Sequence, residues 1–138
     1  MDRIDLQVEV GPVDFAEWAS REKAPARHSD SSAVVRERVL KARARQRQRW
    51  GERSEALNGF VEPAELRRTA EATPAAFATL GSAQKIAAFS ARALDRVLRV
   101  ARTIADLAGS ETVEPTHVIE AVQFRSLDKL RACLAQQR

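Results

Sequence analysis

Most of the chain follows the helical rather than the strand period of apolar and polar residues. Between residues 90 and 108, apolar side chains recur at i, i+3, i+4 and i+7, which predicts an amphipathic helix. Its apolar face comprises Leu94, Val97, Leu98, Ala101, Ile104, Ala105 and Ala108. The polar residues that fall off this face are Asp95, Arg96, Arg99, Arg102 and Asp106. The helix is expected to stop at Gly109, because glycine readily takes the left-handed conformation that ends helices.

Further helices are predicted from their start signals. Proline is tolerated in the first helical turn, where its missing N–H has no partner to lose, so each of three prolines is expected to open a helix. These helices cover about 63–69, 74–88 and 115–125. Side-chain oxygens at residues 30–32 can cap a further helix that runs to about Trp50. Shorter helices are expected at 15–20 and 127–136. The pattern therefore predicts an all-α fold, a small helical bundle.

The first ten residues follow a different period. Ile4, Leu6, Val8 and Val10 alternate with polar residues, which is typical of a β-strand. No other segment of the chain is a convincing strand partner. This indicates that the segment is left over from a larger sheet domain.

Charge is concentrated in one helix. The formal net charge is +4, but the segment 36–49 alone carries +6, which leaves −2 for the rest of the chain. At about 100° per residue, one face of this helix carries Arg38, Lys41, Arg45 and Arg49. Val35, Val39 and Ala42 lie on another face, by which the helix could pack. Such a cationic ridge can bind the phosphate backbone of DNA without reading sequence. The alternatives are a solvated helix face or a contact between subunits.

Composition narrows the class of protein. No segment approaches the roughly 20 apolar residues of a membrane span, so no membrane partner is expected. The single cysteine, Cys133, cannot form an internal disulfide, which favours a cytoplasmic location. His28 and His117 have no carboxylate or cysteine at ligand spacing, so no metal site is predicted.

Two segments resemble a known family. They are DRIDLQVEV at 2–10 and SARALDRVLRVARTIADLAGSETVEPTHVIEAVQFRSLD at 90–128. Together with the basic helix and ELRR at 65–68, they resemble the C-terminal part of magnesium-chelatase-like AAA+ ATPases, and most closely the competence-protein (ComM/YifB) branch. In that family, an α/β ATP-binding core precedes a helical lid. The resemblance implies that residues 1–12 are a remnant of the last core strand, 13–29 a short helix and mobile linker, and 30–138 the lid. Met1 would then not be the natural start of the protein.

The resemblance also implies cofactors and partners. ATP and Mg²⁺ would bind the full-length protein, and the lid would contact its own core and neighbouring subunits, in a ring, with DNA as a further candidate partner. This chain contains no G-x-x-x-x-G-K-[ST] phosphate loop and no apolar strand ending in acidic residues. The isolated chain is therefore not expected to hydrolyse ATP.

Two arginines match functional positions of the family. Arg92, in the pattern S-x-R at the start of the long helix, corresponds to the second sensor, which contacts the γ-phosphate of ATP. A guanidinium suits this role because it stays charged and can donate two hydrogen bonds to one phosphate. Arg3 corresponds to an arginine finger that acts on the ATP of an adjacent subunit. The alternative is that Arg92 is an ordinary surface arginine and Arg3 a polar strand residue.

Three functions follow from these observations. The first is a regulatory lid of an ATPase in the competence branch, which is associated with DNA remodelling. The second is a free-standing helical module that binds nucleic acid through the helix at 36–49. The third is the chelatase branch proper, in which the partner would be another chelatase subunit.

Overall fold

The computed structural model describes residues 4–12, 15, 19, 30–51 and 57–125. Its elements are α2 (Ser32–Trp50), the 3₁₀ turn η1 (Asn58–Phe60), α3 (Pro63–Thr69), α4 (Pro74–Ala87), α5 (Ala91–Ala108) and α6 (Pro115–Gln123). No strand forms within the described residues, so the predicted small all-α bundle is confirmed. Phe15 and Ala19 are helical, but most of the helix expected at 15–20 lies outside the described residues, as does the one expected at 127–136.

The helices begin where the sequence offers caps. The hydroxyl oxygens of Ser31, Thr73 and Ser90 accept hydrogen bonds from the backbone N–H three residues later, at 3.2–3.4 Å. Prolines open α3, α4 and α6, as predicted. Before α6, the backbone N–H of Glu114 donates to Nδ1 of His117 at 3.0 Å. His117 therefore has a role in helix capping.

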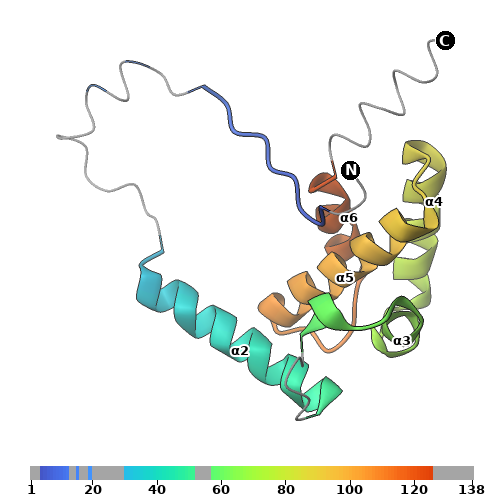
Figure 1. Cartoon of the computed structure of the whole chain (residues 1–138), viewed down its shortest axis with the longest axis horizontal. Coiled ribbons are helices and arrows are strands. Elements are labelled where there is room, and N and C mark those ends of the chain that lie inside the picture. Colours follow the sequence, from blue (N-terminus) through green and yellow to red (C-terminus); the bar gives the residue numbers. More distant parts are fainter. Residues whose placement is uncertain (1–3, 13–14, 16–18, 20–29, 52–56, 126–138) are drawn as a thin grey trace.

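Helix α5 is the centre of the bundle. Figure 1 shows it crossing the middle of the molecule, with α6 and α4 on one side and α2 on the other. Its residues Val97, Leu98, Ala101 and Ala105 are buried. The core that they form also includes Trp50, Leu66, Leu80, Phe89, Val113 and Val118, which come from the surrounding helices and loops. Burial of these apolar side chains is the main favourable contribution to folding.

The N-terminal segment is extended but forms no β ladder within its described residues, 4–12. The backbone N–H of Gln7 donates to the carbonyl oxygen of Phe124 at 2.8 Å. Arg125 Nη1 donates to the carbonyl oxygen of Ile4 at 3.1 Å, and Asp5 forms an ion pair with Arg96. The segment is thus anchored on α5 and on the end of α6. Its origin as the last strand of an ATPase core stays a prediction.

The loops before α4 and α6 lie side by side. Ala72 and Val113 form an isolated parallel bridge, in which Val113 N donates to the carbonyl oxygen of Glu71 at 3.0 Å. Thr73 N donates in turn to the carbonyl oxygen of Val113 at 3.1 Å. These bonds join two loops that are 40 residues apart in sequence, and they fix where α4 and α6 begin.

Two glycines are expected to respond to alanine substitution in opposite directions. Gly109 ends α5 at φ 79°, where an L-residue is strained, so Gly109→Ala should lower the free energy of unfolding by about 1–2 kcal/mol. Gly81 lies inside α4 and a Cβ there would meet no atom within 4 Å, so Gly81→Ala should raise it by about 1 kcal/mol. Urea unfolding followed by circular dichroism measures both changes. A stabilising Gly109→Ala would contradict the assigned helix end.

Candidate functional site

Arg92 lies in the first turn of α5 and is exposed. Ser90 caps this turn by accepting from the N–H of Ala93 at 3.2 Å. Within the described part of the chain, the Arg92 guanidinium has no hydrogen bond or ion pair. The first turn of a helix also carries the positive end of the helix dipole. An anion at this position would therefore be favoured by the dipole and by the charge of Arg92.

The next arginines on this face of α5 are already engaged. Arg96 follows Arg92 by four residues and forms the ion pair with Asp5. Arg99 follows by seven, and its Nη2 donates to the carbonyl oxygen of Val61 at 3.0 Å. Arg96 and Arg99 therefore hold the N-terminal segment and the η1 region against α5. Of these three arginines, Arg92 is the one whose charge is available for a ligand.

The basic residues of α2 do not form one exposed ridge. Arg38 and Lys41 are exposed and pair with Asp30 at 2.6 Å and with Glu37 at 2.7 Å. Arg45 is half-buried, and one of its guanidinium nitrogens, Nη2, lies 3.5 Å from where a Cβ would stand if Gly109, at the end of α5, were alanine. The four predicted contact residues thus divide into an exposed pair, Arg38 and Lys41, and a pair facing α5, Arg45 and Arg49. Their role in nucleic-acid binding stays a prediction.

Arg49 of α2 forms an ion pair with Asp106 of α5, whose carboxylate is fully buried. Its two terminal nitrogens donate to the two oxygens of Asp106 at 3.1 and 2.7 Å. The side chain of Arg49 is 13% exposed and that of Asp106 is 0% exposed. A paired hydrogen-bond geometry of this kind, shielded from water, is strong and directional. It joins the last turns of α2 and α5.

Arg102 is also fully buried, although the sequence pattern places it on the polar side of its helix. Its Nη2 lies 3.0 Å from Oδ1 of Asp106. Its terminal nitrogens also donate to three carbonyl oxygens, those of Ala70, Ser110 and Glu111, at 2.8–3.0 Å. Burial lowers the pKa of the Arg102 guanidinium from its ordinary value, and the charge of Asp106 opposes that shift.

Asn58 completes this polar centre from the η1 turn. Its side-chain nitrogen donates to Asp106 Oδ2 at 2.9 Å and to Thr103 Oγ1 at 3.1 Å. Its side-chain oxygen accepts from Trp50 Nε1 at 3.0 Å, and its backbone N–H donates to Gln46 Oε1 at 3.0 Å. All the polar atoms of the Asn58 side chain are therefore satisfied. We call Gln46, Arg49, Asn58, Arg102 and Asp106 the buried polar cluster.

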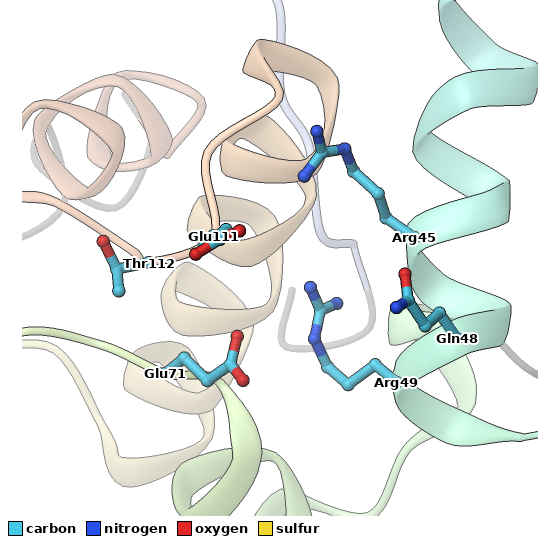
Figure 2. A pocket seen from close by; sticks show the side chains of 6 residues that line it. All are labelled: Arg45, Gln48, Arg49, Glu71, Glu111 and Thr112. Carbon is cyan, nitrogen blue, oxygen red and sulfur yellow. The ribbon is translucent and has the colours of Figure 1, made fainter.

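A cleft of about 510 Å³ lies beside this cluster, between α2 and the loops that face it. Figure 2 shows Arg45, Gln48 and Arg49 extending from α2 toward Glu71, Glu111 and Thr112 on those loops. The cleft carries two guanidinium and two carboxylate groups, so its charge is mixed rather than anion-selective. Arg49 is committed to Asp106, and Glu71 lies 3.9 Å from Arg102. This arrangement favours a structural role for the cleft.

The other candidate residues and groups need less description. Arg3, the arginine-finger candidate, lies outside the described residues. Among residues 4–12, 30–51 and 57–125, no group of three histidine, cysteine or carboxylate side chains is placed to hold a metal ion. None of the helices described is long and apolar enough to cross a membrane.

Comparison with known proteins gives one family and several relatives. The family described as magnesium chelatase, subunit ChlI C-terminal, matches residues 29–125. The uncharacterized protein YifB of Escherichia coli is 34% identical over 130 residues, and the competence protein ComM of Haemophilus influenzae is 33% identical over 130 residues. Each alignment covers 94% of this chain, and the chain spans 24% of the length of each relative. No solved structure is significantly similar to the chain.

Proposed function

Because this chain belongs to the family of the magnesium chelatase subunit ChlI C-terminal region, we propose that it acts as the helical lid of a longer ATPase. The membership confirms the resemblance inferred from residues 2–10 and 90–128. The lid closes over ATP and Mg²⁺ that are bound by an α/β core. The similarity to a competence protein supports the competence branch. On this proposal DNA is the substrate of the longer protein.

The observation that carries this proposal is that the guanidinium of Arg92 is available to bind a ligand. It is exposed and lacks a described partner, whereas Arg96 and Arg99 on the same face are engaged. A bidentate contact from Arg92 to the phosphates would couple bound nucleotide to the position of α5. Because α5 is the centre of the bundle, the whole lid would move with it. Arg3 would act separately, on the ATP of an adjacent subunit in a ring.

The proposal predicts how ATPase activity divides between parts of the protein. The 138-residue chain alone should show no turnover of ATP above background, because it has no phosphate-binding loop. The full-length protein should hydrolyse ATP, and removal of residues 30–125 should lower its turnover at least tenfold. Release of inorganic phosphate measures all three preparations.

Nucleotide binding provides the control for this experiment. Because the core holds the phosphates in this proposal, the lid-deleted protein should still bind a fluorescent ATP analogue. Loss of turnover together with retained binding supports a lid that completes the site. Undiminished turnover without residues 30–125, or turnover by the isolated chain, would contradict the proposal.

A further inference from the structure

The first half of α2 extends beyond the bundle. Every residue from Ser32 to Lys41 is exposed, and the first buried residue of the helix is Ala42. Figure 1 shows the first turns of α2 projecting past the end of α5. Val35 and Val39, which the sequence places on the packing face, are 44% and 40% exposed. They do not pack because no other described element reaches them.

These valines continue a face that is already used for packing. Val35 and Val39 precede the buried residues Ala42, Gln46 and Trp50 at spacings of four, three, four and four residues. Such spacings place all five residues on one stripe of the helix. Two turns of a packing surface are therefore continuous with the α2–α5 interface but have no described contact of their own.

Basic side chains border this stripe on both sides. At about 100° per residue, Arg36, Arg43 and Arg47 lie along one side and Arg38 and Arg45 along the other. Arg38 pairs with Asp30, whereas the guanidinium groups of Arg36 and Arg43 have no described partner. The surface is thus an apolar strip between two cationic rims.

We propose that this face, centred on Val35 and Val39, binds an apolar protein surface that is bordered on both sides by carboxylates. A second copy of the same face is disfavoured, because its arginines would oppose those of the first. A phosphate backbone would satisfy the arginines but would place anionic groups against the valines and bury no apolar surface. An acidic-rimmed apolar partner satisfies both features. This inference does not depend on nucleotide binding by Arg92.

The test uses a defined probe and the 138-residue chain. The probe is a labelled helical peptide with leucines along one face and glutamates on both sides of it; a single-stranded oligonucleotide of equal charge is the comparison. Fluorescence anisotropy at low salt measures both affinities. The peptide should bind more tightly than the oligonucleotide. Val35→Ala with Val39→Ala should weaken peptide binding at least fivefold, and so should Arg36→Gln with Arg43→Gln.

The control is Leu40→Ala, which removes a larger exposed apolar side chain from outside the stripe and should leave peptide affinity unchanged. Alanine has a higher helix propensity than valine, so circular dichroism should show α2 intact in the valine variant. The proposal is overturned if the peptide does not bind or if the valine variant binds it as well as the parent. Tighter binding of the oligonucleotide, weakened by the arginine changes alone, would instead identify a nucleic-acid surface. Self-association of the chain that is abolished by the valine changes would identify a second copy as the occupant and also overturn it.

Discussion

Asp106→Ala is expected to lower the free energy of unfolding by about 3–5 kcal/mol, since it leaves buried cations without their partner. The carboxylate of Asp106 contacts Arg49, Arg102 and Asn58, and its side chain is fully shielded from water. Without it, the two guanidinium groups would face each other in a site that has few other acceptors for Arg49. Chemical unfolding followed by circular dichroism, with the fluorescence of the buried Trp50 as a second signal, measures the loss.

An exposed ion pair at the start of α2, between Asp30 and Arg38, provides the control. Asp30 and Arg38 are each about half exposed, so Asp30→Ala should change the free energy of unfolding by less than about 1 kcal/mol. The contrast between the two aspartates isolates the effect of burial from the loss of a charge. If Asp106→Ala unfolded at the same denaturant concentration as Asp30→Ala, the buried polar cluster would not stabilise the fold as described.

Arg92→Ala in the full-length protein should reduce ATP turnover at least tenfold and leave the fold intact. The reduction is expected because the proposed guanidinium–phosphate contact strengthens as charge develops on the transferred phosphoryl group. The fold should survive because Arg92 is exposed and has no described partner to lose. Steady-state phosphate release measures turnover, and the thermal unfolding midpoint of the variant reports on the fold.

Two further variants separate a specific contact from a general effect of charge. Arg92→Lys keeps the charge but cannot donate in the bidentate geometry, so it should recover only part of the lost turnover. Arg68→Ala removes another exposed arginine, from the last turn of α3, and should have no effect. Normal turnover in Arg92→Ala would eliminate the sensor assignment.

The sequence predicts the helices well because their ends carry explicit signals. The capping oxygens at 30–32 and the three prolines place helix starts, and Gly109 places the end of α5. The bounds expected for α4 and α6 exceed the observed ones by one and two residues, which is the usual fraying of helix ends. The apolar stripe of α5 likewise predicts its buried face.

The buried polar cluster escapes this reasoning, because periodicity assigns every charged residue of α5 to the solvent. Arg102 and Asp106 are four residues apart on the polar face, but α2 and two backbone segments, at Ala70 and at 110–111, cover that face. Their burial depends on partners that are distant in sequence, such as Arg49 and Asn58. No local pattern specifies that such partners meet. The i, i+4 spacing of Arg102 and Asp106 indicates only the ion pair between these two residues.

In α2 the pattern fails the other way, because it assigns to the packing face two apolar residues that are exposed in the structure. Its packing face is predicted in the right direction, since Ala42 is buried, but Val35 and Val39 remain exposed because α5 ends before it reaches them. The sequence pattern places Arg49 on the cationic ridge, whereas in the structure it pairs with the buried Asp106 of α5. The length of the neighbouring helix, rather than the pattern within α2, decides which residues are covered.

The hydrogen bonds of Arg102 have a consequence for how this domain can diverge. Arg102 is bound to the main-chain oxygens of Ala70, Ser110 and Glu111, and every amino acid supplies such an oxygen. Substitutions at 110 and 111 should therefore leave these hydrogen bonds intact. The arginine itself cannot be replaced, because no other amino acid carries a guanidinium with five N–H donors. Relatives with different side chains at these two positions should therefore share the same loop conformation.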